Sequence, residues 1–173
     1  MSFTYLLALV LALTTLTACS PTLNWREVRV DQTPMLALFP CKPELNSREV
    51  TLGGKAVTMT LMGCEAGGAS FALVNADLKD ATTLDAIQTQ WRQATLANIH
   101  AQKVKESLFS IQTGRDKALA LRVIAQGLRP DGSTMHLQGV WFALGTHVFL
   151  ASVVSDQASP ATAESFFEGL RAP

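Results

Sequence analysis

The alternation of apolar and polar residues predicts three strands in the first half of the chain. Residues 35–40 (MLALFP) form a short apolar run, which ends where prolines remove backbone donors. Residues 48–64 (REVTLGGKAVTMTLMGC) alternate on both sides of Gly53 and Gly54, a pair that tolerates the positive φ angles of a tight turn. We therefore expect a hairpin with one buried face, followed by a third strand over residues 69–78.

A helical period replaces the alternation after Asp80. Apolar side chains then recur at three- and four-residue spacing, Thr82 or Thr83 can cap the N-terminus, and Asp85 suits the first turn. The pattern predicts a helix of about 17 residues that ends near His100.

Three more strands and a closing helix are expected in the second half. Residues 117–128 form one strand, and residues 134–155 form two strands that are divided at Gly145-Thr146. The RPDGS sequence between them has the residues of a turn. The last helix is predicted to begin at Ser159, a capping residue, with Pro160 in its first position. Its apolar residues should dock on the sheet: Phe166, Phe167 and Leu170.

These elements predict an α+β domain. Tight hairpins join strands in antiparallel order, and two helices must cover an apolar face, so we expect an antiparallel meander sheet covered by two helices. In outline this order resembles the PsbP/Mog1-like fold. The 173 residues suffice for one domain, which we place at 25–173.

Charge excludes one class of partner. The chain has 14 Lys and Arg against 14 Asp and Glu, so it lacks the clustered positive excess of a nucleic-acid groove. The nearest approach to a charge run, KVKE at 103–106, is interpreted as a solvated helix end or loop.

The N-terminus has the pattern of an export signal. Residues 3–16 are apolar and uncharged, but they are fewer than the roughly 20 that a membrane-spanning helix needs. Leu16 is bulky for the −3 position of an ordinary signal cleavage after Ala18. The order Leu16, Thr17, Ala18, Cys19 instead resembles the lipobox of bacterial lipoproteins.

That resemblance implies a lipid anchor. In this class the signal peptide, here residues 1–18, is removed, the Cys19 thiol carries diacylglyceryl, and the new amine is acylated, commonly with palmitate. Two or three acyl chains hold a protein stably at a membrane. Ser20, where an Asp would retain the protein at the inner membrane, implies the outer membrane with the domain in the periplasm. Residues 19–24 would be a short tether; a plain secreted protein and an uncleaved anchor are the alternatives.

The remaining cysteines are expected to pair. With Cys19 lipidated, Cys41 and Cys64 are left, and two thiols in an oxidising compartment form a disulfide most simply. Two free buried thiols, or a functional thiol, are the alternatives. No C-x-x-C motif is present, and no histidine lies at metal-ligand spacing from either cysteine.

The search for chemistry finds no catalytic or metal-binding set and implies no cofactor. His136 and His147 fall on adjacent strands and could face each other, but nearby carboxylates are lacking, so surface positions are favoured. Asp77 and Asp80 are read as capping residues at the helix entry. The three tryptophans are expected as core anchors, with Trp25 partly exposed.

Three short stretches, NWREVRV, LFPCKP and the terminal FFEGLRAP, resemble short lipoproteins of proteobacteria with no assigned activity. The resemblance implies a location and a shared domain. The sequence as a whole therefore predicts a non-enzymatic outer-membrane lipoprotein that contacts another envelope protein or a small ligand. An envelope enzyme or a small-ligand carrier in the periplasm is the alternative.

Overall fold

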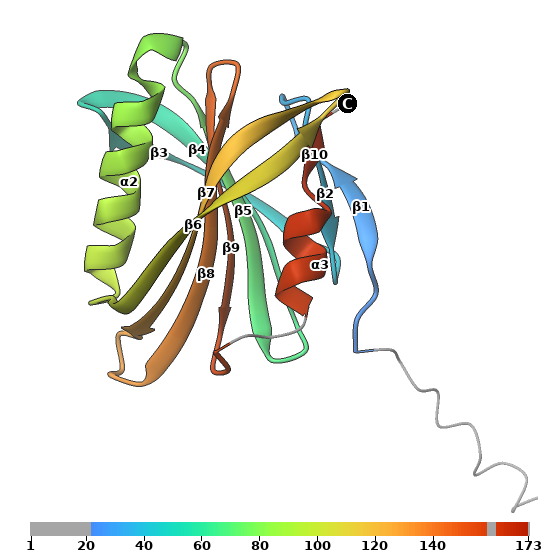
Figure 1. The fold of residues 1–173 in the computed structure, drawn as a ribbon, viewed down its shortest axis with the longest axis vertical. Helices are drawn as coiled ribbons and strands as arrows, with labels where there is room; N and C mark the ends of the chain where they lie inside the picture. The colour runs from blue at the N-terminus through green and yellow to red at the C-terminus, as the bar shows by residue number, and fades with distance from the viewer. Residues whose placement is uncertain (1–21, 159–161, 173) are drawn as a thin grey trace, which may run out of the picture.

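A computed structural model of the chain describes residues 22–158 and 162–172 and places ten strands in one sheet (Figure 1). The strands are β1 (Arg26–Arg29), β2 (Leu36–Phe39), β3 (Glu44–Leu52), β4 (Lys55–Ala66), β5 (Ala69–Asp77), β6 (Gln102–Thr113), β7 (Asp116–Leu128), β8 (Thr134–Leu144), β9 (His147–Ser155) and β10 (Arg171–Ala172). The helical elements are the short 3-10 turn η2 (Ala81–Thr83), α2 (Leu84–Asn98) and α3 (Thr162–Glu168). The order across the sheet is β1-β2-β10-β6-β7-β8-β9-β5-β4-β3.

The sheet curls around α3 to form a half-barrel. The ring of Phe166 on α3 lies 5.2 Å from the ring of Phe39 on β2 and 5.5 Å from that of Phe71 on β5, measured between centroids. β2 and β5 are separated by five other strands in the sheet, so a flat sheet could not bring both to one side chain. The Cys41–Cys64 disulfide joins the segment that follows β2 to β4.

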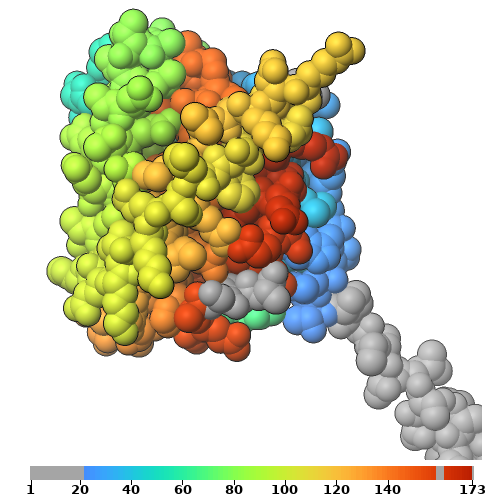
Figure 2. Space-filling model, in the orientation of Figure 1, coloured from blue at the N-terminus to red at the C-terminus, as the bar shows by residue number. Residues whose placement is uncertain are grey.

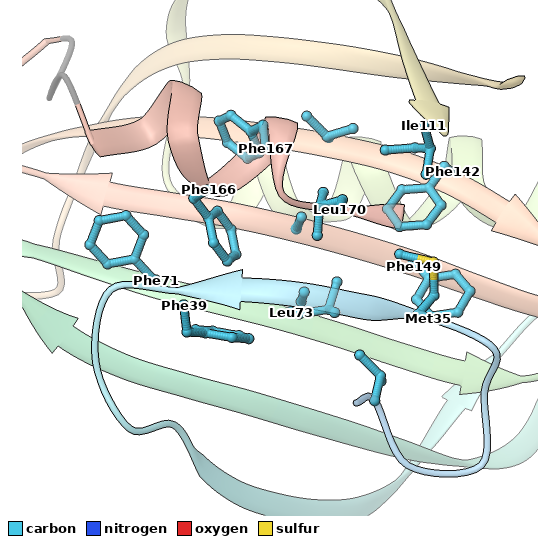
Figure 3. Packing of buried hydrophobic residues seen from close by; sticks show 14 of the residues in the cluster. Met35, Phe39, Phe71, Leu73, Ile111, Phe142, Phe149, Phe166, Phe167 and Leu170 are labelled. Atoms are coloured by element: carbon cyan, nitrogen blue, oxygen red, sulfur yellow. The ribbon is translucent and has the colours of Figure 1, made fainter. Parts of the chain in front are cut away.

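Apolar side chains fill the inside of the half-barrel (Figure 3). Met35, Phe149 and Phe142 follow the phenylalanines along the interior, and the last two rings stack with 4.8 Å between centroids. Large aromatic groups supply most of this buried area, and such packing is the main source of stability in a domain of this size. The closing helix therefore forms the centre of the core.

The outer face of the sheet carries α2, which Figure 1 shows lying along it. Trp91 from the helix packs with Trp141, Val123 and other apolar residues of β7, β8 and β9. The indole of Trp141 packs closely against Gly139 on its own strand. A Cβ at residue 139 would stand 2.6 Å from the indole Cη2, so the ring fits there only because Gly139 has no side chain.

The predicted α+β class is wrong, and so is the predicted resemblance to the PsbP/Mog1-like fold. More than half of the described residues are in strands, and the two helices do not cover one face of a meander sheet. α2 lies outside the curled sheet and α3 lies within it. The prediction failed because it lacked β1, β10 and β6, the strands that continue the sheet far enough for it to curl.

Several local predictions are confirmed. The hairpin turn at Gly53-Gly54 joins β3 to β4, and both glycines have positive φ. The helix predicted to end near His100 is α2. The Cys41–Cys64 disulfide is present, with 6.0 Å between the two Cα atoms. Trp25 is half-buried against the inner core, as expected.

The KVKE segment is not a helix end or loop but part of β6. Its neighbour β7 pairs with it along most of its length, and both strands extend into a hairpin that projects from the body of the molecule (Figure 2). Lys and Glu were misleading because an exposed strand face tolerates charge. Leu108 and Leu119 on this hairpin are three-quarters exposed.

Some predictions fall on other parts of the chain. The signal peptide at 1–18, the lipidation site Cys19 and the cap at Ser159-Pro160 lie outside the described residues. Among residues 22–158 and 162–172, no helix has the length and apolar character that crossing a membrane requires.

Candidate functional site at the mouth of the half-barrel

A polar hollow of about 650 Å³ opens at one end of the half-barrel. We call it the mouth pocket. Its walls are the β1–β2 turn, with Asp31 and Gln32, and the inner faces of β3, β4 and β5 near the β3–β4 and β5–η2 ends. The apolar interior stops at Met35 and Phe149, and polar side chains replace apolar ones beyond that level.

A row of uncharged polar side chains forms the floor of the mouth pocket. Ser47, Thr60 and Asn75 stand opposite one another on β3, β4 and β5. The hydroxyls of Ser47 and Thr60 are 3.2 Å apart, within hydrogen-bond distance. Asn75 is only 5% exposed, and within the described part of the chain no acceptor pairs with its Nδ2 atom. Buried amide donors are normally paired, so this one needs an explanation.

Asp77 lies one step further along β5 and gathers several donors. Its Oδ1 accepts from Thr146 Oγ1 at 2.6 Å and from the Lys79 backbone N–H at 2.9 Å. Its Oδ2 is 2.5 Å from Lys79 Nζ and 3.8 Å from His147 Nε2. These partners come from the β5–η2 segment and from the turn between β8 and β9, which meet only in the folded sheet.

The partners of Asp77 keep it ionised. Burial raises the pKa of this carboxyl, but the hydrogen bonds from the Lys79 side chain, Thr146 and the Lys79 backbone, with the charge of His147, outweigh that effect. The pKa of Asp77 is consequently held well below its usual range. At neutral pH the group is a fixed negative charge with most of its hydrogen-bonding capacity already used.

Two further charged groups of the pocket, Lys55 and Asp80, also form a pair. Lys55 Nζ lies 3.7 Å from Asp80 Oδ2. Asp80 in addition accepts from the Thr82 hydroxyl and backbone N–H, which lowers its pKa. The predicted capping role of Asp80 is therefore confirmed at η2, whereas Asp77 belongs to the pocket.

The rim of the pocket has a defined backbone shape. Gln32 and Lys79, on opposite sides of it, both adopt a φ of 56°, which non-glycine residues rarely do. The Gln32 turn is held by Thr33, whose hydroxyl donates to the Val30 carbonyl and accepts from the Met35 N–H. Strained residues of this kind persist only where the surrounding structure holds them.

The histidines do not form a joint site. His136 and His147 lie on neighbouring strands, but His136 pairs with Ser155 and His147 pairs with Leu144, at opposite ends of the β8–β9 ladder. The possibility that they face each other is therefore excluded. Among the described residues, no group of three or more His, Cys, Asp or Glu side chains is arranged to hold a metal ion.

A second, more apolar groove of about 450 Å³ lies on the outer face, where Trp91 of α2 approaches Met59 and Leu61 of β4. It is lined mainly by core-type side chains and lacks a buried unpaired polar atom. The mouth pocket is therefore the better candidate.

Comparison with known proteins does not assign the chain to a family. No family model matches the chain, and no curated protein matches it. A solved structure of a Pseudomonas aeruginosa protein of unknown function, described as a candidate regulator, aligns over 82% of this chain and 88% of its own. The sequences are 18% identical and the TM-score is 0.34, so the similarity carries no argument about function.

Sequence reasoning missed Asn75, Thr60 and Ser47. Each lies in a strand that was predicted from its apolar residues. The local sequence pattern does not show that these three polar side chains stand side by side on neighbouring strands. The usable signal was a polar interruption in an otherwise apolar strand, since Asn75 follows Leu73 and Val74 in β5.

Proposed function

We propose that the chain is a non-enzymatic binding module, anchored by lipid to the periplasmic side of the outer membrane, which holds a small polar ligand in the mouth pocket. One observation carries the binding role: Asn75 lines the open pocket, and its buried Nδ2 atom has no acceptor among the described residues. A ligand that supplies an acceptor would satisfy it.

The pocket chemistry favours binding over catalysis. His147 is the natural general base of this pocket, yet its nearest charged partner, Asp77, is already held by Lys79 and Thr146. The Ser47 and Thr60 hydroxyls bond to each other, so neither is paired with the imidazole as an activated nucleophile would be.

The envelope location is supported by the cysteines. The lipobox-like LTAC sequence at 16–19 places a cysteine where a lipoprotein carries its anchor. The Cys41–Cys64 disulfide suits an oxidising compartment such as the periplasm. Ser20 is the residue on which the outer-membrane assignment rests.

Membrane fractionation tests the anchor. The wild-type chain should fractionate with outer membranes and Cys19→Ser should not, because the latter has no thiol to receive the lipid. Equal distribution of both proteins among the membranes would show that Cys19 does not anchor the chain.

A thermal-shift experiment tests the binding role. A small-molecule extract of the bacterial envelope should raise the Tm of the purified chain, because a ligand that binds only the folded state stabilises it. Thr58→Trp should abolish the shift, since Thr58 is exposed and its side chain enters the mouth pocket. Thr51→Trp, on the exposed edge strand β3 outside the pocket, should keep it. No shift with the wild-type chain would contradict the binding role.

A further inference from the structure

We propose that the ligand of the mouth pocket is an uncharged saccharide of one or two sugar rings. The inference rests on the proposed binding role and adds the chemical class of the ligand. Three features of the pocket carry it: a neutral hydrogen-bonding floor, lysines that are already paired with carboxylates, and apolar surface between the polar groups.

The floor offers hydrogen bonds to a ligand but carries no charge of its own. Asn75 Nδ2 is buried and has no acceptor among the described residues, and an amide N–H donates to hydroxyl and carbonyl oxygens alike. Beside it, the Ser47 and Thr60 hydroxyls can both donate and accept. A row of amide and hydroxyl groups matches the alternating donors and acceptors around a sugar ring.

The charged groups select against an ion. Lys79 is paired with Asp77 and Lys55 with Asp80, so the lysines are balanced by carboxylates within the same pocket. Asp31 adds a further carboxylate at the rim. An anion would have to approach these carboxylates, and a cation at Asp77 or Asp80 would have to displace a lysine that is already in place. A neutral ligand leaves both ion pairs intact and still reaches the floor.

The rest of the lining suits the C–H faces of a sugar. Ala56, Val57 and Leu78 lie among the polar residues and provide apolar contact surface. The hollow of about 650 Å³ falls within the usual range of small-ligand sites, roughly 300 to 1,000 Å³. Its rim is held in shape by the turns at Gln32 and Lys79, so little ordering is needed when a ligand binds.

The test is a titration of the full chain, purified from membranes in a detergent without a sugar headgroup and labelled with nitrogen-15. The three probes are N,N′-diacetylchitobiose, a neutral disaccharide with acetamide carbonyls, inorganic phosphate as an anion, and glycylglycine as a zwitterion. We expect the disaccharide to shift the Asn75 side-chain amide signals and the backbone signals of Thr60 and His147 in a saturable manner. Phosphate and glycylglycine should leave these signals in place.

Variants connect the signal to the pocket. Asn75→Leu, which keeps the size but removes the donor, should weaken disaccharide binding at least tenfold. Asn46→Leu, on the same sheet but outside the pocket, should leave it unchanged. Because Asn75 is buried, Thr58→Trp provides an exposed second variant that blocks the pocket, and it should abolish the signal shifts.

The outcomes separate the two proposals. If phosphate or glycylglycine saturates the pocket signals and the disaccharide does not, the saccharide class is wrong and the binding role stands. If the envelope extract stabilises the wild-type chain through the pocket but no probe binds, the saccharide class is again overturned alone. If neither extract nor probe acts on the pocket, both proposals fail.

Discussion

Arg122 on β7 binds both carboxylate oxygens of Glu164 on α3, with 2.9 Å between Nη1 and Oε2. The same guanidinium donates to Gln138 Oε1 at 2.6 Å and lies 5.2 Å from the centroid of the Phe167 ring. One side chain thus fixes the seven-residue helix inside the half-barrel through an ion pair, a hydrogen bond and a cation–π contact.

Arg122→Met should destabilise the fold more than Glu164→Gln. The Arg122 side chain is 15% exposed, and its loss leaves the nearly buried Gln138 without its donor, which costs about 1 to 3 kcal/mol. The Glu164 side chain is 55% exposed, so water screens the pair and Glu164→Gln should cost no more than about 1 kcal/mol. Urea denaturation measures both. Equal losses would show that the contacts of Arg122 with Gln138 and Phe167 contribute nothing.

Asp77→Asn should reduce stability at neutral pH and remove part of the acid sensitivity. The folded state lowers the pKa of Asp77, so its contribution is fully present above its unfolded pKa of about 4 and is lost as the pH falls toward the lower folded value. The expected cost at pH 7 is about 1 to 3 kcal/mol, because the hydrogen bonds involve a charged group.

The matching measurement is the free energy of unfolding from pH 7 down to pH 3. The gap between wild-type and Asp77→Asn proteins should narrow as the pH falls. Asp116→Asn, at the start of β7 in the exposed turn that follows β6, serves as the control and should parallel the wild-type curve. A gap that is constant across the range would mean that the charge of Asp77 does not stabilise the fold.

Gly139→Ala should destabilise the domain by about 1 to 3 kcal/mol, the usual cost of overpacking a filled core. The added methyl group would overlap the Trp141 ring, whose Cη2 would stand 2.6 Å away, and Trp141 is fully buried under α2. The fluorescence maximum of the tryptophans should shift to longer wavelength with the loss of packing. Gly63→Ala, where the nearest atom would be at 3.2 Å, is the milder comparison; an equal loss there would argue against the Trp141 clash.

Removal of the disulfide should loosen the attachment of the segment that follows β2 to β4. Replacement of Cys41 and Cys64 by serine is expected to cost about 3 kcal/mol, the chain-entropy value for a loop of this length. The midpoint of guanidinium denaturation measures the change. The wild-type protein in strong reductant should lose a similar amount, and a midpoint that reduction does not move would show that the cross-link adds no stability.

Short-range signals determined a good part of this protein in advance. The Gly53-Gly54 turn and the helical period of α2 each depend on neighbours in the chain, and each led to the observed element. The count of three cysteines is a property of the whole sequence, and it led to the observed disulfide. Two interior strands of the sheet, β6 and β10, were not predicted from the sequence. β6 carries lysine and glutamate on an exposed face, and the two residues of β10 are too short to form a pattern.

The tertiary structure alone decided the curl of the sheet and the mouth pocket. Phe166 was expected to dock on the sheet, but its contacts with both β2 and β5 follow from strand order, which local periodicity does not encode. The strand register likewise decided the roles of Asn75 and Asp77, because it places Asn75 opposite Thr60 and Asp77 opposite His147. Hydrogen bonding between strands joins residues that are distant in sequence, and only the packed fold selects which ones meet.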